Sequence, residues 1–148
     1  MVYQVVSLSS NRLSKFGDYD FFEHIQVLSP TKKGELGTKE LNRVLQETLN
    51  PPSEFKSEKH SMGVIFREQD KIMQIRNNYD IYWERKGTEY EYGSGVFNGE
   101  MGIIEKIDEV EKQVKIRFDD DKEAWYAFSD LDQIEHAYAI TIHKAQRK

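Results

Sequence analysis

Short apolar stretches, separated every few residues by glycine, asparagine or aspartate, fill residues 64–130 of this chain. The segment VKIRF is the clearest of them, because Val114, Ile116 and Phe118 alternate with charged residues. Such alternation is typical of a strand with one buried face. The segments GIIEKIDE, QVKIRFDD and EAWYAFS predict three short consecutive strands, and the region as a whole predicts a small antiparallel β-barrel.

Glycine marks the turns of this predicted barrel. Asn98-Gly99 predicts a turn in which the backbone needs a positive φ, and Gly102 predicts a bend or bulge where the next strand starts. The segment KIMQIRNNY (71–79) predicts another strand, although its alternation is imperfect. The segment YWERKGTEYEYGSG (82–95) is aromatic, charged and glycine-bearing, and it predicts a hairpin-like excursion.

A different pattern comes before the barrel. Ile25, Val27 and Leu28 form a dense apolar run that stops at Pro30, which predicts a strand buried on both faces, as in a parallel sheet. The segment TKKGELG predicts a loop, since two glycines interrupt it, and Thr38 predicts the N-cap of a helix. One apolar stripe runs along this predicted helix and consists of Leu41, Val44, Leu45 and Leu49.

The predicted helix ends at Asn50, because the residue before a proline avoids the α region. The polar segment 53–62 predicts a connecting loop. Strand, glycine loop and helix in this order are typical of an α/β layer fold. Near the other end of the chain, residues 134–148 predict a strand that leads into a basic loop, with an alanine-rich helix as the alternative.

Composition excludes several classes of protein. Of the 148 residues 38% are apolar, enough to form a core, yet no run of eighteen apolar residues predicts a membrane-spanning helix. The N-terminal segment lacks the pattern of a secretory signal, and the absence of cysteine excludes disulfides and fits a reducing cytoplasm. The net charge of −5 argues against the whole chain being a free-standing nucleic-acid binder, although TKKG and HKAQRK are locally basic.

Three ordered segments resemble one known family. IQVLSPTKKGELGTKELNRVLQETLNP (25–51) resembles the early part of the second motor domain in RecD/TraA-type superfamily 1 DNA helicases, to which exodeoxyribonuclease V alpha chains are similar. AYAITIHKAQ (137–146) resembles a later motif of that family, in which a strand leads into a Thr-x-His-Lys-x-Gln loop. Between them, FREQDKIMQIRNNY and VFNGEMGIIEKID resemble the SH3-like barrel inserted into that domain.

Two features depart from the family pattern. Gln69 stands where the family usually shows a glycine, and the segment DIYWERKGTEYEYGSG (80–95) separates the two barrel segments more widely than expected. Neither departure touches a motor motif. A third observation concerns the phosphate-binding loop of the first motor lobe, Gly-x-x-x-x-Gly-Lys-Ser/Thr, which this sequence does not contain.

The resemblance implies an α/β plus β fold: a partial RecA-like lobe with an inserted SH3-like antiparallel barrel. It implies three parts, with 1–62 as the first part of the second RecA-like lobe, 63–133 as the barrel, and 134–148 as the returning strand and motif loop. The implied activity is that of an ATP-dependent 5′-to-3′ DNA helicase. We expect the chain to be a fragment of such a helicase that does not hydrolyse ATP alone, because the phosphate-binding loop is missing.

The same resemblance implies cofactors and partners. ATP and Mg²⁺ are expected in the full-length protein, with no cofactor and no metal site in the fragment. The expected partners are single-stranded DNA, the missing first motor lobe and nuclease or helicase subunits, with no membrane contact and a cytoplasmic location.

Site residues follow by resemblance, residue by residue. Those expected at the nucleotide cleft are Lys32, Lys33, Gly34 and Gln146. Those expected at single-stranded DNA are Thr141, His143, Lys144, Arg76, Asn78 and Tyr79. Cations neutralise phosphate oxygens, and an arginine beside an aromatic ring stacks on bases. Structural alternatives stay open: Lys32 and Lys33 as exposed lysines, and Trp83, Tyr90 and Tyr92 as cover for the barrel edge rather than stacking groups.

A second class of function also stays open. A non-enzymatic SH3-like module that binds nucleic acid or protein explains residues 64–130, but it leaves the segment LSPTKKGELGTKELNRVLQ (28–46) without a purpose. A complete small hydrolase lacks support, because no Ser/His/Asp arrangement and no motif of paired carboxylates stands out.

Overall fold

The computed structural model of this protein describes residues 27–29 and 34–141. The chain divides into two compact units, one formed by Met1–Ser53 with His136–Lys148 and the other by Glu54–Glu135. The borders predicted from the sequence, after residues 62 and 133, differ from these, because the polar segment before residue 62 contains a strand of the second unit. The assignment of the first unit to a RecA-like lobe stays a prediction.

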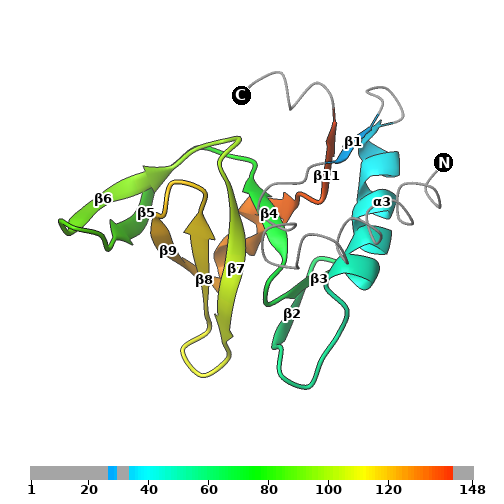
Figure 1. Ribbon diagram of the computed structural model, residues 1–148, viewed down its shortest axis with the longest axis horizontal. Helices are drawn as coiled ribbons and strands as arrows, with labels where there is room; N and C mark the ends of the chain where they lie inside the picture. The colour runs from blue at the N-terminus through cyan, green and yellow to red at the C-terminus, as the bar shows by residue number, and fades with distance from the viewer. Residues whose placement is uncertain (1–26, 30–33, 142–148) are drawn as a thin grey trace. The chain divides into compact units, whose positions relative to one another are not determined.

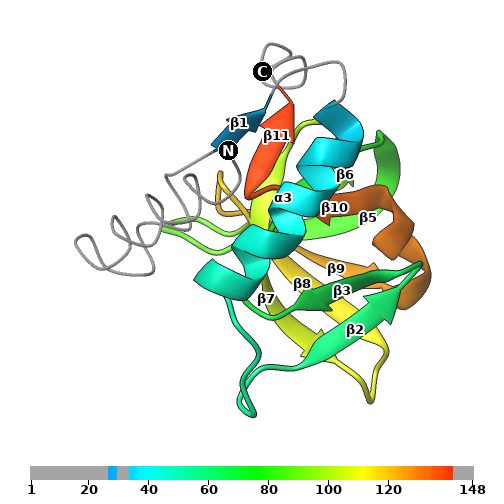
Figure 2. The same cartoon turned by 90° about the vertical axis from the view of Figure 1, so that its right-hand side faces the viewer.

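The first unit contains a parallel pair of short strands and one helix. Strand β1 (Val27–Ser29) pairs with β11 (Ala139–Thr141), and α3 (Gly34–Leu49) follows β1 along the chain. The register pairs Val27 with Ala139 and Ser29 with Thr141. Figure 2 shows the two strands side by side with the helix along them. The order strand, helix, parallel strand is that of a βαβ unit, here with the whole second unit between helix and second strand.

Helix α3 begins earlier than the sequence predicts. It starts at Gly34, so the two glycines of the predicted loop lie in its first turn, and Thr38 lies inside the helix rather than at its N-cap. Packing of the apolar stripe outweighs the helix cost of a glycine, which is about 1 kcal/mol. Leu41, Leu45 and Leu49 are buried as predicted. The helix ends at Leu49, just before Asn50-Pro51, which confirms the predicted stop.

The second unit is mostly β-structure. Its strands are β2 (Glu58–Ser61), β3 (Val64–Arg67), β4 (Lys71–Gln74), β5 (Asn78–Arg85), β6 (Glu91–Val96), β7 (Met101–Asp108), β8 (Gln113–Phe118) and β9 (Glu123–Ala127). A 3-10 helix, η1 (Phe128–Gln133), then leads into β10 (Ile134–His136), whose last residue is already assigned to the first unit. The three predicted consecutive strands are confirmed as β7, β8 and β9, and the predicted hairpin as β5 with β6.

The strands form an open sheet rather than the predicted closed barrel. Seven of them follow in the order β10-β4-β7-β8-β9-β5-β6, with β10 and β6 at the two edges, and β2 pairs only with β3. In Figure 1, β5 and β6 extend together to the left of β8 and β9 as a two-stranded ribbon. The ribbon corresponds to the segment that departs from the family pattern, and in the described part of the chain β6 pairs only with β5.

The predicted connecting loop 53–62 ends in a hairpin. Its two-residue turn consists of Met62 and Gly63, which have φ values of 51° and 78°, as a type I′ turn requires. Glu58 and Arg67 face each other across the hairpin, and the buried Arg67 donates from Nε to the Glu58 carboxylate at 2.5 Å. Nothing in the sequence indicated β2, because its residues, Glu58–Ser61, are polar like those of the loop around them.

The hydrophobic core of the second unit lies under the seven-stranded sheet. Its buried members are Phe66, Ile72, Ile81, Val96, Ile104, Ile107, Val114, Ile116, Phe118, Ala124, Tyr126, Leu131 and Ile134. The alternation of Val114, Ile116 and Phe118 that is visible in the sequence points all three side chains into it. Asn98-Gly99 forms the predicted turn, in which Gly99 has a φ of 99°.

Gly102 has a different role from the predicted bend. It lies inside β7 opposite Phe118, and a Cβ at this position would stand 2.5 Å from the Arg117 carbonyl oxygen and 2.9 Å from the Phe118 Cα. Since both neighbours are backbone atoms, a side chain here would push the two strands apart. The glycine is therefore needed for the close approach of β7 and β8.

A buried polar network crosses the second unit beside the apolar core. The Tyr126 hydroxyl donates to Gln74 Oε1 at 2.7 Å, and Gln74 Nε2 donates to Gln133 Oε1 at 3.2 Å. Asn78 Nδ2 donates to the same Gln133 oxygen at 2.9 Å. The network joins β9, β4, η1 and β5, and each amide in it finds a partner, as buried polar groups must. Burial raises the pKa of Tyr126 well above its usual range, so this hydroxyl stays a donor.

The backbone of Gln69 has a left-handed conformation, which a glycine adopts more easily. It has a φ of 78° in the turn between β3 and β4, where its N–H donates to the Ile104 carbonyl at 2.7 Å. This is the residue that replaces the glycine usual in the resembling family. Left-handed backbone is easy for glycine and costs about 1 kcal/mol or more for other residues.

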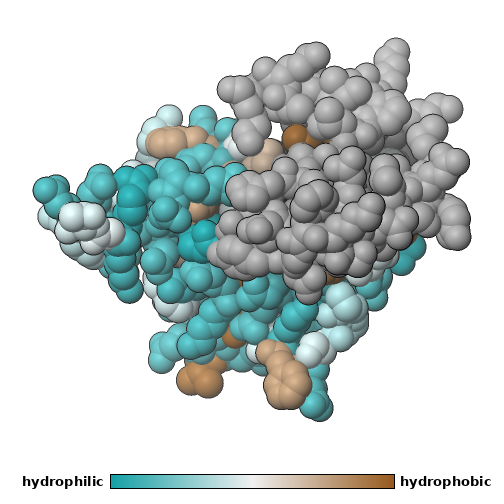
Figure 3. All heavy atoms as spheres, in the orientation of Figure 1, coloured by the Kyte–Doolittle hydropathy of each residue, from teal (hydrophilic) through white to brown (hydrophobic). Residues whose placement is uncertain are grey.

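The described surface of the second unit is largely polar. On the face that Figure 3 shows, exposed apolar side chains include the brown atoms over the β7–β8 turn and over the segment ahead of β2, where Val110 and Phe55 are exposed. Among the described residues, no helix is both long and apolar enough to cross a bilayer.

Candidate nucleic-acid interface

The carboxyl ends of β1 and β11 lie next to each other at one edge of their sheet. Ser29 pairs with Thr141, and α3 starts at Gly34, five positions along the chain from Ser29. Ligands of parallel α/β sheets bind outside the carboxyl ends of the strands, and the N–H groups of a helix start suit phosphate oxygens. Two predicted site residues, Gly34 and Thr141, are thus placed at this edge.

Five other predicted site residues lie outside the described residues: Lys32, Lys33, His143, Lys144 and Gln146. The chain passes to them directly from Ser29 and from Thr141. Ser29 and Thr141 are paired although they are more than a hundred positions apart in the sequence. The positions and the roles of the five residues stay predictions.

Asn42 holds β11 in place, and the sequence analysis did not single it out. Its Nδ2 donates to the Ala139 carbonyl at 2.9 Å, and its Oδ1 accepts the Ala139 N–H at 2.7 Å. The same Nδ2 lies 3.2 Å from the His136 carbonyl. The side-chain amide therefore occupies the edge of β11 as a neighbouring strand would. Asn42 is buried next to the leucine stripe of the helix, and a polar residue beside such a stripe is the signal that points to it.

Gln46, one turn after Asn42, extends this polar contact. Its Nε2 lies 3.3 Å from the His136 Nε2, and the ring of His136 is tilted against that of Tyr138 with 6.2 Å between centroids. Gln46 is also buried. The helix thus presents leucines to the unit's interior and two amides to the segment that leads into β11.

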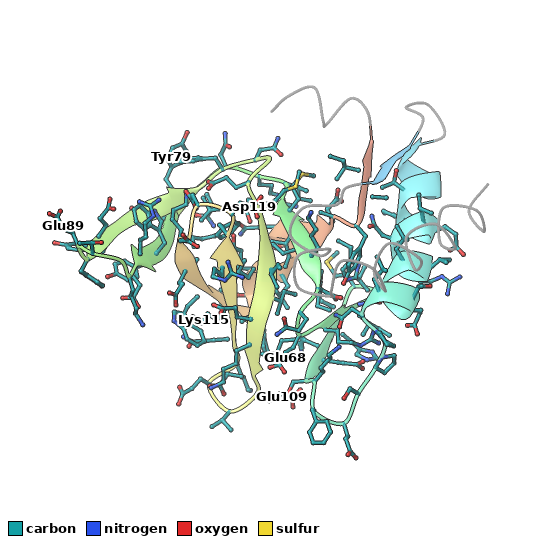
Figure 4. All side chains as sticks on the ribbon, in the orientation of Figure 1. Glu68, Tyr79, Glu89, Glu109, Lys115 and Asp119 are labelled. Atoms are coloured by element: carbon teal, nitrogen blue, oxygen red, sulfur yellow. The ribbon has the colours of Figure 1, made fainter. Side chains whose placement is uncertain are left out.

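The predicted group Arg76, Asn78 and Tyr79 does not form one cluster. Arg76 makes an exposed ion pair with Asp132 at 3.4 Å, whereas Asn78 belongs to the buried polar network. Tyr79 is 68% exposed and meets Phe97 edge-on, with 5.3 Å between ring centroids. Figure 4 labels Tyr79 near the base of the ribbon. Arg76 and Tyr79 are accessible to a ligand, while the Asn78 amide is used inside the protein.

The aromatic residues of the β5–β6 ribbon divide between two faces. Trp83 packs against the core and lies over Gly93, where a Cβ would be 2.8 Å from the indole ring. Tyr82, Tyr90 and Tyr92 are exposed together. Strand alternation separates Tyr82 from Trp83. Trp83 therefore fits the structural alternative, in which the ring covers the sheet, whereas Tyr90 and Tyr92 are exposed with Tyr82, which the sequence analysis did not single out.

The sequence of the chain matches one protein family over more than half of its length. Residues 41–118 match the ATP-dependent RecD-like DNA helicase SH3 domain. This chain belongs to the RecD-like helicase SH3 family. The matched stretch starts in α3 and runs through β8, so it includes the helix that carries Asn42 as well as most of the open sheet.

Two curated proteins are similar to this RecD-like helicase SH3 chain. The uncharacterized protein MJ1519 of Methanocaldococcus jannaschii is 36% identical over 153 residues, which cover 94% of this chain and 13% of that protein. The ATP-dependent RecD2 DNA helicase of Deinococcus radiodurans is 28% identical over 127 residues, which cover 82% of this chain and 14% of that protein. The chain therefore spans about one seventh of the length of these relatives.

A solved structure of two coordinating Pif1 helicases at forked double-stranded DNA is also similar. The likeness covers 93% of this chain and 33% of that one, at 17% identity and a TM-score of 0.46. This similarity is too low to support a conclusion about the fold or function of the RecD-like SH3 chain.

The described part of the RecD-like SH3 chain contains no group of three or more histidine, aspartate or glutamate side chains that could hold a metal ion. Its charged side chains instead pair with one another across strands. Lys115 is the clearest case, because Glu123 at 2.7 Å and Glu105 at 3.8 Å flank it. The hydrogen bond to Glu123 raises the Lys115 pKa.

Proposed function

We propose that this chain is part of an ATP-dependent 5′-to-3′ DNA helicase of the RecD type, in which it contributes one side of the ATP cleft and part of the single-stranded DNA path. The observation that supports the proposal is the parallel pairing of β1 with β11, because Ser29 and Thr141, the last residues of these strands, lie next to each other, and the two lysine-bearing segments follow them in the sequence. Membership of the RecD-like helicase SH3 family and the similarity to RecD2 support the same function.

In this proposal Lys32, Lys33, Gly34 and Gln146 lie at the nucleotide cleft. A lysine near transferring phosphate oxygens neutralises their charge, and the first N–H groups of α3 add a positive helix end. The described residues therefore fit a nucleotide at this edge, where bound ATP with Mg²⁺ supplies the phosphoryl group that is transferred to water. A first motor lobe has to supply the phosphate-binding loop, so the chain alone is expected to hydrolyse no ATP.

The proposed DNA contacts follow β11. The hydroxyl of Thr141 and the side chains of His143 and Lys144 contact backbone phosphates, which positions single-stranded DNA without reading its sequence. Arg76 and Tyr79 provide a second contact on the other unit, where a guanidinium and an aromatic ring are both accessible. Nuclease or helicase subunits are further partners in this proposal.

The decisive experiment is Lys144→Ala in the full-length protein, assayed by DNA-stimulated ATP turnover. We expect turnover to fall by about tenfold or more, because a cation that contacts the DNA or nucleotide phosphates is lost. The matched control is Lys106→Ala on β7, because that lysine is exposed and its ion pair with Asp108 is long at 4.0 Å. ATP turnover of this variant should equal that of the wild type. Equal turnover in the two variants would remove Lys144 from the mechanism.

The isolated chain tests the DNA path separately. In fluorescence anisotropy with labelled oligothymidine, we expect weak binding whose affinity falls steeply between 50 and 200 mM salt, by about tenfold for each two or so phosphates neutralised. Lys144→Ala should weaken this binding and Lys106→Ala should not. An affinity that does not change with salt contradicts a phosphate contact.

A further inference from the structure

The β5–β6 ribbon presents three tyrosine rings together on its outer face. Tyr82, Tyr90 and Tyr92 are 52%, 56% and 68% exposed. Their ring centroids lie 6.5 Å apart for Tyr82 and Tyr92, and 5.9 Å apart for Tyr90 and Tyr92. Glu84 stands opposite Tyr92 in the ladder. These four residues are called the tyrosine face.

The tyrosine face is held in position by its own hydrogen bonds and by the opposite side of the ribbon. The Tyr90 hydroxyl donates to Glu84 Oε2 at 2.6 Å and lies 3.4 Å from the Tyr82 hydroxyl. On the opposite side, Trp83 lies over Gly93 and packs on the core. A ligand therefore meets rings that are already ordered, which lowers the entropy cost of binding.

The charge around these rings is negative. Residues 79–97 contain four carboxylates, Asp80, Glu84, Glu89 and Glu91, and two basic side chains, Arg85 and Lys86. Both basic groups have acidic partners, because Arg85 pairs with Asp120 and Glu91, and Lys86 lies 3.5 Å from Glu84. Figure 4 shows Glu89 at the outer end of the ribbon.

This charge disfavours two possible occupants. It repels the phosphates of nucleic acid, whose binding depends on cationic side chains. It also opposes pairing with the same face of a second copy, which carries the same carboxylates. The hydrogen bond from Tyr90 lowers the pKa of Glu84, so this carboxylate keeps its charge in mildly acidic solution as well.

Strand β6 of the ribbon is also an edge strand. Strand β6 is the last strand of the seven-stranded sheet, so among the described residues no strand pairs with its outer side. An extended peptide can add to such an edge by backbone hydrogen bonds and place alternate side chains on one face. Tyrosine rings attract cations over their π-faces, most strongly when carboxylates stand nearby.

We propose that the tyrosine face and the β6 edge form a docking site for an extended basic segment of a partner protein. Lysine or arginine side chains of that segment lie between the three tyrosine rings and the carboxylates of the ribbon. The docking site does not depend on the helicase function.

The test uses three labelled probes of equal length with the whole chain: a twelve-residue peptide of alternating arginine and threonine, one of alternating glutamate and threonine, and oligothymidine. We expect the arginine peptide to bind and the glutamate peptide not to bind. The double variant Tyr82→Ser with Tyr92→Ser should weaken the arginine peptide by about tenfold, as the loss of two cation–π contacts implies.

Two matched variants separate the possible occupants. Phe55→Ser removes an exposed ring outside the tyrosine face, in the segment ahead of β2, and should leave arginine-peptide binding unchanged. Glu84→Gln keeps the shape but removes the charge of the tyrosine face, so it should weaken the arginine peptide and leave oligothymidine binding equal or stronger. Circular dichroism of each variant confirms that the sheet is intact.

Several results would overturn the proposal. One is equal binding of the arginine and glutamate peptides. Another is oligothymidine binding that the Tyr82→Ser, Tyr92→Ser variant abolishes, which would assign the rings to nucleic acid. A third is a dimer in sedimentation that dissociates in the same variant, which would make the face an interface between copies.

Discussion

In the Glu54–Glu135 unit, β7, β8 and β9 follow one another along the chain and pair with their sequence neighbours, whereas β1 and β11 of the other unit pair across the whole inserted sheet. The first arrangement forms from local hairpins. The second requires the closure of a long loop before any contact forms, and long-range contacts of this kind are slow to form and expensive in chain entropy. The two units therefore differ in how much their strands depend on side-chain hydrogen bonds to stay together.

Each unit meets this need with a different polar device. In the first unit one amide, Asn42, hydrogen-bonds both backbone groups of a residue 97 positions away. In the second unit a network of Gln74, Tyr126 and Gln133 ties strands that the ladder already holds. We therefore expect the first unit to depend on a single side chain and the second to tolerate the loss of one.

The largest expected effect is that of Asn42→Ala. It leaves the N–H and C=O of Ala139 without their partners, which costs about 2–4 kcal/mol for two buried groups. Hydrogen exchange should show β11 amides losing protection while β8 amides keep theirs. Arg43→Ala is the control on the same helix, because its ion pair with Glu40 is exposed and its loss should change neither strand. Unchanged protection of β11 in Asn42→Ala contradicts the comparison.

Tyr126→Phe should have a smaller effect, and only on the second unit. It removes the donor to the buried Gln74 Oε1, at a cost of about 1–2 kcal/mol in unfolding by urea. A β11 that loses protection in this variant would show that the two units do not depend on separate devices.

The raised pKa of Tyr126 predicts how the stability of the second unit depends on pH. Burial raises the pKa of Tyr126 in the folded state above its ordinary value of 10.0. The unfolded state therefore loses the proton first, so this contribution to stability is complete below pH 10.0 and is lost as the pH rises beyond it. The wild type should lose stability more steeply than Tyr126→Phe between pH 10 and 11. Parallel pH curves for the two proteins would mean that Tyr126 ionises equally in both states.

The smallest expected effect is a gain in the stability of the second unit. Gln69→Gly relieves a φ of 78° and should stabilise the second unit by about 0.5–1 kcal/mol, after the extra chain entropy of glycine is subtracted. The control is Gln113→Gly, because Gln113 is exposed in regular strand β8 and the same replacement there should destabilise. If both replacements destabilise equally, the backbone at Gln69 is not strained.

The sequence predicted the second unit best where its signal is local. The period of two in β8 placed Val114, Ile116 and Phe118 on the buried face, and Asn98-Gly99 located a turn. It failed where the signal is weak or depends on partners. The polar strand β2 looked like a loop, and Gly102 looked like a bend although the approach of β8 requires it. The sheet is open instead of a barrel, because its two edge strands, β10 and β6, do not pair with each other.

For the candidate site, the sequence supplied residues but not their arrangement. The resemblance named Gly34 and Thr141, and the structure has α3 begin at Gly34 and pairs Thr141 with Ser29. It named Asn78 as well, which the buried network uses instead. Tyr82 and Asn42 were missed, since alternation on a ribbon and a polar residue beside the leucine stripe of a helix become meaningful only when their partners are known.

The sequence by itself indicated the family of this chain, the buried face of β8 and the end of its helix, because these signals depend on residues within a few positions of one another. Only the tertiary structure decided that β1 lies beside β11, that Asn42 binds the edge of β11, and that Tyr82 faces outward while Trp83 faces the core. The physical reason is distance along the chain. Side chains that meet across a hundred residues leave no period in the sequence, and only packing brings them together.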